Sequence, residues 1–191
     1  MIRAIVPGFG AAGDRFDGTR PEKRSNARCR PVKEERVDRP SWDEYFMSLA
    51  HLAASRSTCS RRHVGSVIVK DRMVLSTGYN DTPRGMKNCG DGGCERCRSD
   101  AAAGTSLDTC LCLHAEQNAI IQAAYHGVAV AGSTIYSTHQ PCLTCAKMIV
   151  NGGIVRIVFD EPYPDAVAER MLKEASIELV RCAPPAAKAR R

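Results

Sequence analysis

The sequence has no apolar run that approaches the length of a membrane-spanning helix. Its weakly apolar start, residues 4–12, is interrupted by Pro7 and two glycines, which does not match the composition of a secretory signal. These absences exclude a membrane-spanning protein and argue against an exported one. We therefore expect a protein of the cytoplasm that makes no contact with a membrane.

Excess positive charge is missing from the central part of the chain, although the whole chain carries a net charge of +6. Residues 41–181 contain fourteen basic and fifteen acidic residues, whereas residues 1–40 carry a net +4 and residues 182–191 a net +3. Proteins that bind along nucleic acids concentrate Lys and Arg on one face. The central part therefore predicts a small-molecule substrate and argues against a nucleic-acid partner.

Composition divides the 191 residues into three regions. Residues 1–40 contain Gly, Pro, Arg and Asp without periodicity, which predicts a disordered or loosely attached N-terminal extension. Residues 41–181 have the length and apolar content of one folded domain, and residues 182–191 form a basic C-terminal tail. The sequence shows no internal repeat.

Within residues 41–181, apolar residues alternate between helical and strand periodicity. Asp71-Arg72 predicts a hairpin turn between the first two strands, and residues 80–109 predict a long loop. Strands that alternate with helices after an initial hairpin predict an α/β layered fold, with a central mixed sheet of about five strands flanked by helices. The predicted helices span residues 41–57, 114–126, 142–151 and 165–175, and the strands span residues 64–70, 73–79, 134–138, 154–159 and 177–181.

Two short segments carry the residues of a candidate metal site. They are His114-Ala115-Glu116 and Pro141-Cys142-Leu143-Thr144-Cys145, and each begins a predicted helix. Cys142 and Cys145 lie three residues apart in the first turn, where the helix dipole favours thiolates. One imidazole and two thiolates supply three zinc ligands and leave the fourth position to water, as in catalytic zinc sites.

Glu116 lies two residues from His114, so it does not share the helical face of that ligand. A carboxylate beside the open zinc position can take a proton from water and deliver it to a leaving group. The two segments therefore predict a hydrolytic zinc enzyme. The alternatives are a structural zinc site, which needs four protein ligands, and simple core packing.

Ten cysteines in a chain expected in a reducing compartment indicate metal ligands rather than disulfides. Several lie two to four residues apart, which predicts a second, structural zinc that would order the loop over residues 80–109. Free thiols in a loop are the alternative. The candidates exceed the four ligands needed, and the preferred set is Cys59, Cys89, Cys94 and Cys110, with Cys97 and Cys112 as alternatives.

Residues from about 42 to 180 resemble the deoxycytidylate (dCMP) deaminase family, including its bacterial competence-operon relatives. His-x-Glu followed by Pro-Cys-x-x-Cys is the signature of the zinc-dependent deaminases. Four segments carry the resemblance in the same order: Val64-Gly65-Ser66-Val67, Gly78-Tyr79-Asn80-Asp81-Thr82-Pro83-Arg84-Gly85, Leu111-Cys112-Leu113-His114-Ala115-Glu116-Gln117-Asn118-Ala119, and Pro141-Cys142-Leu143-Thr144-Cys145.

The resemblance implies a cytidine-deaminase-like fold and the hydrolysis of dCMP to dUMP and ammonia by a zinc-bound hydroxide. It also implies a second zinc near the clustered cysteines, a homo-oligomer, and regulation by dCTP and dTTP. By this resemblance His114, Cys142 and Cys145 bind the catalytic zinc, Glu116 is the proton shuttle, Asn80 contacts the sugar, and Arg62 and Tyr163 fall where the family lines its phosphate and base pocket.

Two other classes of function stay open from the sequence. One is a deaminase of another substrate, such as another cytosine nucleotide or nucleoside, or adenosine in tRNA. The other is a zinc-bound interaction module that has lost catalysis. The near-neutral charge of residues 41–181 disfavours tRNA, and the presence of Glu116 argues against an inactive module.

Overall fold

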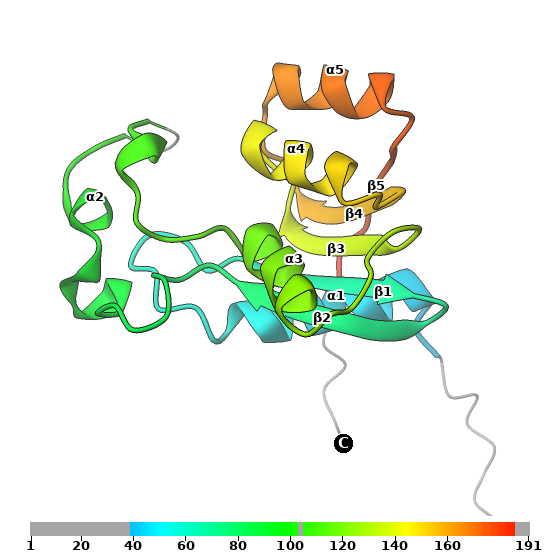
Figure 1. Cartoon of the computed structure of the whole chain (residues 1–191), viewed down its shortest axis with the longest axis horizontal. Helices are drawn as coiled ribbons and strands as arrows, with labels where there is room; N and C mark the ends of the chain where they lie inside the picture. The colour runs from blue at the N-terminus through cyan, green and yellow to red at the C-terminus, as the bar shows by residue number, and fades with distance from the viewer. Residues whose placement is uncertain (1–38, 103–104, 186–191) are drawn as a thin grey trace, which may run out of the picture. The chain divides into compact units, whose positions relative to one another are not determined.

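A mixed five-stranded sheet lies at the centre of residues 39–102 and 105–185, which are the residues that the computed structural model describes (Figure 1). Strand β1 runs antiparallel to β2 and β3, whereas β3, β4 and β5 run parallel to one another. The predicted mixed sheet is confirmed. Its order is β2-β1-β3-β4-β5, formed by β1 (Gly65–Lys70), β2 (Met73–Tyr79), β3 (Thr134–His139), β4 (Arg156–Glu161) and β5 (Glu178–Arg181).

Helices cover both faces of this sheet, with α1 on one face and α3, α4 and α5 on the other (Figure 1). Their bounds are α1 (Trp42–Ala54), α3 (Ala115–Tyr125), α4 (Leu143–Asn151) and α5 (Ala166–Glu174). No helix within residues 39–102 or 105–185 is both long enough and apolar enough to cross a membrane.

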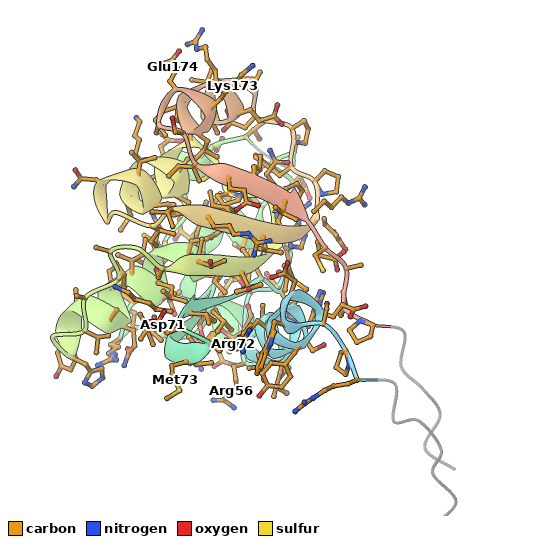
Figure 2. All side chains as sticks on the ribbon, turned by 90° about the vertical axis from the view of Figure 1, so that its right-hand side faces the viewer. Arg56, Asp71, Arg72, Met73, Lys173 and Glu174 are labelled. Carbon is orange, nitrogen blue, oxygen red and sulfur yellow. The ribbon has the colours of Figure 1, made fainter. Side chains whose placement is uncertain are left out.

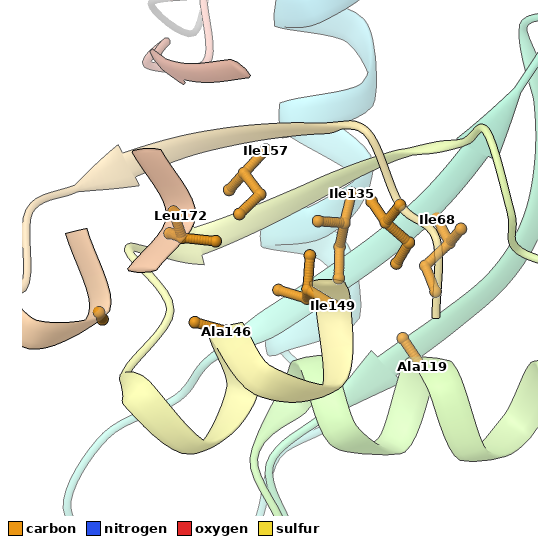
Figure 3. Packing of buried hydrophobic residues seen from close by; sticks show 9 residues of the cluster. Ile68, Ala119, Ile135, Ala146, Ile149, Ile157 and Leu172 are labelled. Carbon is orange, nitrogen blue, oxygen red and sulfur yellow. The ribbon is translucent and has the colours of Figure 1, made fainter. Parts of the chain in front are cut away.

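Alternation along the central strands builds two separate cores, because successive side chains point to opposite faces. Figure 3 shows the first core, where isoleucines of the sheet pack against α3, α4 and α5. Its members include Ile68, Ala119, Ile135, Ala146, Ile149, Ile157 and Leu172. The intervening residues Val67, Tyr136 and Val158 face the other side and pack against Phe46, Met47 and Ala50 of α1.

The hairpin between β1 and β2 turns at Asp71 and Arg72, as predicted (Figure 2). Both residues have positive φ angles, 52° and 63°, and Lys70 pairs with Met73 across the turn. Two central residues with positive φ match the twist of the flanking strands. The hairpin therefore closes with a two-residue loop.

The observed elements start and end within about three residues of their predicted bounds, with two informative differences. Strand β4 begins at Arg156 rather than at residue 154, because the N–H of Ile154 bonds the carbonyl of Ile149 in the turn that ends α4. The predicted loop over residues 80–109 contains three short elements: η1 (Cys89–Gly93), α2 (Glu95–Arg98) and η2 (Leu107–Thr109).

The predictions for the two ends of the chain lie largely outside the described residues. The described residues do not include residues 1–38 of the expected N-terminal extension or residues 186–191 of the expected basic tail. The three-region division therefore stays a prediction.

Gly78 of β2 lets α3 lie directly against the sheet. A Cβ atom at this position would stand 2.2 Å from the carbonyl oxygen of Ala115 and 2.4 Å from the backbone nitrogen of Ala119. These are backbone atoms, so no side chain can rotate away to make room. The position of the start of α3 thus depends on the missing side chain at Gly78.

We predict that Gly78→Ala lowers the free energy of unfolding by about 1–3 kcal/mol, the usual cost of overpacking a filled interior. Chemical denaturation followed by circular dichroism measures this change. Thr77→Ala is the matched control, because Thr77 is the exposed neighbour on the same strand. Equal stability of the two variants would contradict the close packing of α3 on β2.

Candidate active site

The start of α3 and the start of α4 bring three metal donors together. His114 immediately precedes α3 and Cys142 immediately precedes α4, each in extended backbone, and Cys145 lies in the first turn of α4. The Nδ1 atom of His114 is 3.3 Å from Sγ of Cys145 and 3.4 Å from Sγ of Cys142. All three donor atoms lie within 4.8 Å of one another.

This donor set fits zinc. Bonds of about 2.0 Å to nitrogen and about 2.3 Å to sulfur in a tetrahedron separate the two donor atoms by roughly 3.6 Å. The observed nitrogen–sulfur separations are close to this value. The group contains three protein donors, so a zinc ion bound there would keep one position for a water molecule or substrate.

Cys142 is embedded in hydrogen bonds that favour a thiolate, whereas the hydrogen bond with Cys142, together with burial, raises the pKa of Cys145. Donation from the Cys145 thiol, with a further bond to His114, lowers the pKa of Cys142 to about 4. The hydrogen bond between His114 and Cys142 raises the pKa of His114 above its ordinary value. Cys142 is therefore ready to bind a metal ion at neutral pH without first losing a proton to solvent.

Asp165 holds the start of α4 in place. Its Oδ2 atom accepts a hydrogen bond of 2.9 Å from the N–H of Leu143, and its Oδ1 atom accepts one of 3.0 Å from the N–H of Ala168. The hydrogen bond from Ala168 is the main cause that lowers the pKa of this carboxyl. One carboxylate thus caps α5 and fixes the first residue of α4, between Cys142 and Cys145.

The start of α3 is fixed at the end of β2 in a similar way. Leu113 forms an isolated bridge with Asp81, and its N–H donates to the Asp81 carbonyl at 2.8 Å. The side-chain amide of Asn118 donates to the carbonyl of Tyr79 at 2.7 Å. These bonds set His114 beside the edge of the sheet where the metal donors gather.

The Glu116 carboxyl group is buried beside the metal donors, with only 4% of the residue exposed. Its Oε1 atom accepts a hydrogen bond of 3.1 Å from Oγ of Ser137, which in turn accepts one of 2.9 Å from Oγ of Ser66. Its Oε2 atom lies 3.5 Å from Sγ of Cys145. Burial raises the pKa of Glu116 above its ordinary value and so favours the protonated form of this carboxyl group.

A cavity of about 610 Å³ opens at this edge of the sheet, which is a usual size for a small-ligand site. The loops after β2, β3 and β4 and the loop before β1 all contribute to it. Its lining residues are Cys59, Arg61, Arg62, Val64, Asn80, Arg96, Cys97, Cys110, Cys112, His114, Ala115, Glu116, His139, Gln140, Cys142, Tyr163 and Pro164.

Asn80 lines the cavity and also ties two segments together. Its Oδ1 atom accepts a hydrogen bond of 2.7 Å from the N–H of Val64, and its Nδ2 atom donates one of 2.7 Å to the carbonyl of Arg62. An asparagine amide has two N–H donors and two lone pairs on its oxygen, so half of this capacity is used here. The remaining N–H and lone pair are available to a ligand.

The two neighbouring arginines before β1 differ in what they bind. The guanidinium of Arg61 donates to the backbone carbonyls of Cys97, Ser99 and Ala101, and so holds the loop around α2. Among the described residues, no hydrogen bond engages the guanidinium of Arg62, which lines the cavity. Arg62 is therefore the better candidate for binding an anionic group of a ligand.

Tyr163, which follows β4, also lines the cavity. Its N–H donates to Oε1 of Gln140 at 3.4 Å, and Nε2 of Gln140 donates to Glu169 at 2.9 Å. The cavity therefore contains all three residues predicted to bind substrate: Asn80, Arg62 and Tyr163.

The six cysteines predicted around a second zinc also meet in one cluster, and Cys59, Cys97, Cys110 and Cys112 of this cluster line the cavity. The four preferred residues do not form one set: Cys59 and Cys89 belong to one group of four, and Cys94 and Cys110 to another. Cys97 and Cys112, the alternatives, belong to both groups. Spacing along the chain could not reveal this division, because it depends on how the loop folds over Cys59.

Sequence reasoning missed two residues that support the site: Asp165 and Ser137. Asp165 had a detectable signal, since an Asp at the start of a predicted helix is a typical N-cap. Ser137 lies between Tyr136 and Thr138 in a predicted strand, and a small polar residue there is weak evidence of a buried contact. The resemblance implied that Gln140 lies at the rim of the substrate pocket, but its contacts with Glu169 and Tyr163 were not predictable, because they join segments distant in the sequence.

The fold and the site together define a layered α/β protein in which a three-donor zinc site and a buried carboxyl group face one cavity. Comparison with known proteins narrows this class. The sequence model of one family, described as "Cytidine and deoxycytidylate deaminase zinc-binding region", matches residues 40–161. This range includes the proposed metal donors and Glu116.

Individual relatives agree with this match. Deoxycytidylate deaminase of Schizosaccharomyces pombe is 47% identical over 148 residues, which are 77% of this chain and 46% of that protein. ComE operon protein 2 of Bacillus subtilis is 39% identical over 142 residues, which are 74% of this chain and 71% of that protein. The chain thus spans just under half the length of the fission yeast relative.

A solved structure of dCMP deaminase from the cyanophage S-TIM5, in complex with dCMP and dUMP, has the same fold. The TM-score is 0.64 at 30% sequence identity, and the match covers 75% of this chain and 98% of that chain. The chain belongs to the cytidine and deoxycytidylate deaminase family, and its fold is the cytidine-deaminase-like fold. The resemblance stated from the sequence motifs is confirmed.

Proposed function

We propose that this protein hydrolyses dCMP to dUMP and ammonia. The observation that carries the proposal is the arrangement of His114, Cys142 and Cys145 with the buried Glu116 carboxyl on one cavity. The names of the relatives support dCMP as the substrate, since the fission yeast and cyanophage proteins are both described as deaminases of this nucleotide.

His114, Cys142 and Cys145 would hold the zinc ion. When bound, zinc supplies a Lewis acid that makes water reactive at neutral pH. Cys145 binds a metal as a thiolate and then has no proton to donate to Glu116. The Oε2 atom of Glu116 would therefore be free to exchange protons, while Ser137 keeps Oε1 in place.

Hydrolytic deamination adds water at C4 of cytosine and releases the 4-amino group as ammonia. Glu116 Oε2 would take one proton from the water and pass it to N3 of the ring, and a later transfer would reach the departing amino group. The spare N–H and lone pair of Asn80 would contact the sugar hydroxyl, and Tyr163 would border the base. Arg62 would bind the 5′-phosphate.

An ammonia-release screen of dCMP, CMP, deoxycytidine, methylated dCMP and adenosine tests the proposal. We expect dCMP to have the highest kcat/KM of the five. A preference for the nucleoside, for the methylated nucleotide or for adenosine would replace dCMP with that substrate. Ammonia release from none of them by zinc-loaded protein would favour an inactive interaction module.

We predict that Glu116→Gln lowers kcat by about 10²- to 10⁴-fold, the usual contribution of general acid–base catalysis. Zinc content should stay unchanged, because Glu116 is outside the three-donor group. Glu174→Gln on the exposed side of α5 is the control and should keep full activity. Near-normal turnover by Glu116→Gln would rule out its role as the proton shuttle.

We predict that Arg62→Ala lowers kcat/KM for dCMP by roughly 10- to 100-fold, as expected when a charge-assisted hydrogen bond to phosphate is lost. Turnover of deoxycytidine, which has no phosphate, should change little. Arg170→Ala is the matched control, because Arg170 is exposed on α5 and does not line the cavity. An equal loss on both substrates would show that Arg62 supports the fold rather than the phosphate.

We propose further that the protein is a homo-oligomer that responds to dCTP and dTTP, as the family resemblance implies. Large apolar side chains exposed on α1 and on the edge strand β2, among them Trp42, Tyr45 and Met73, support self-association. Sedimentation velocity should give a mass above that of one chain, and each triphosphate should change dCMP turnover. A monomer, or turnover unaffected by either nucleotide, would contradict the corresponding part of this proposal.

A further inference from the structure

Six cysteines from three separate segments form one buried cluster beside the cavity. The first segment contributes Cys59, which follows α1. The second contributes Cys89 at the start of η1, Cys94 just before α2 and Cys97 within α2. The third contributes Cys110 and Cys112, which precede α3. All six are free of disulfide bonds, and all but the half-buried Cys110 are buried. Among the hydrophobic clusters of the described residues, this cluster alone contains residues from the segment between β2 and α3.

The separations of the sulfur atoms fit a metal site. Within each group of four, all Sγ atoms lie within 4.8 Å of one another. The pairs Cys59–Cys97, Cys94–Cys110 and Cys97–Cys110 are each 3.9 Å apart. A tetrahedral zinc site with Zn–S bonds of about 2.3 Å has sulfur–sulfur edges of about 3.8 Å.

The two groups of four overlap in a regular way. Cys59, Cys89, Cys97 and Cys112 form the first, and Cys94, Cys97, Cys110 and Cys112 form the second. Cys97 and Cys112 occur in both, so each group has two sulfurs of its own and shares the other two. Two tetrahedra that share one edge have this composition.

We propose that the six cysteines bind two zinc ions as a binuclear cluster in which Cys97 and Cys112 bridge the metals. Cys59 and Cys89 complete the coordination of one ion, and Cys94 and Cys110 complete that of the other. Each ion is then four-coordinate with no open position, as in structural zinc sites. This cluster is separate from the His114 site, and the inference does not rest on the proposed function.

The number of buried sulfurs favours two ions over one. A single Zn²⁺ would take four of the six cysteines and leave two without a metal, whereas two ions that share two sulfurs use all six. Each proposed ion has one terminal sulfur that accepts hydrogen bonds from backbone N–H groups. The N–H groups of Cys97 and Leu111 donate to the sulfur of Cys94, and the N–H group of Ser60 donates to the sulfur of Cys89. Such donors to ligating sulfurs are typical of metal sites.

The cluster also shapes the cavity. Cys59, Cys97, Cys110 and Cys112 line the cavity together with Arg61. Arg61 donates to the carbonyl of Cys97, one of the bridging residues. Binding of the two ions therefore orders the loop that forms this wall, since few other buried apolar side chains are available to order it.

Zinc content of the full chain, measured by mass spectrometry after zinc loading and desalting under a non-thiol reductant, tests the proposal. We expect three zinc ions per chain, one at the His114 site and two in the cluster. His114→Ala/Cys145→Ala should retain the two cluster ions. The control Cys182→Ser should keep all three, because Cys182 lies beyond β5 and outside both groups. The binuclear cluster would be overturned if the wild-type chain held two zinc ions and His114→Ala/Cys145→Ala held one.

Paired substitutions distinguish bridging from terminal ligands. Cys94→Ser/Cys110→Ser and Cys59→Ser/Cys89→Ser should each lose one zinc ion, because the other group of four stays intact. Cys97→Ser/Cys112→Ser should lose both cluster ions. Loss of only one ion in this last variant would contradict the bridging role.

X-ray absorption of the wild-type protein provides a test that needs no substitution, should a variant fail to fold. Two tetrahedra sharing a sulfur edge place their metals about 3 Å apart. Zinc–zinc scattering at about this distance is expected, whether or not the protein deaminates dCMP. Its absence from fully zinc-loaded protein would overturn the proposal.

Discussion

The contact of His114 Nδ1 with the sulfurs of Cys142 and Cys145 is the constraint on which the candidate active site depends. It requires the first residues of two helices, α3 and α4, to meet at one edge of the sheet. Gly78 allows α3 to approach β2 closely enough, and Asp165 fixes the first turn of α4. The metal donors are thus positioned by backbone packing rather than by flexible side chains.

The same edge of the sheet gathers the rest of the cavity. The end of β2 contributes Asn80, the end of β3 leads to Cys142, and the segment after β4 contributes Tyr163. Because β1 runs antiparallel to its neighbours, its first residues lie at this edge too, and Arg62 just before it reaches the cavity. The mixed sheet therefore brings candidate ligand-binding residues from four loops together.

Hydrophobic periodicity was sufficient to predict the helices, the strands and the initial hairpin, because each core face repeats regularly along its own segment. Strand bounds were less exact where a tight turn takes part of an apolar run, as at Ile154. The order β2-β1-β3-β4-β5 could not be read from single segments, since it depends on contacts between them.

The candidate site likewise contains residues that the sequence could predict and contacts that it could not. His114, Glu116, Cys142 and Cys145 were predictable, because their residue types and spacing carry the chemistry. The supporting contacts of Ser137 and Asp165 were not, since each joins segments more than twenty residues apart.

The two overlapping groups of cysteines were also beyond sequence reasoning. Six cysteines can be combined into four ligands in many ways, and spacing alone does not choose among them. The fold brings Cys59 against the loop that carries the other five, and so defines which sulfurs are shared.

The central claim is that His114, Cys142 and Cys145 hold a zinc ion whose fourth position faces the cavity. Anomalous diffraction at the zinc edge, from crystals of the full chain, tests it most directly. The account predicts a peak within bonding distance of His114 Nδ1 and of both sulfurs, with no fourth protein atom bound. A loaded crystal without a peak there, or with the carboxylate of Glu116 as a fourth ligand, would contradict it.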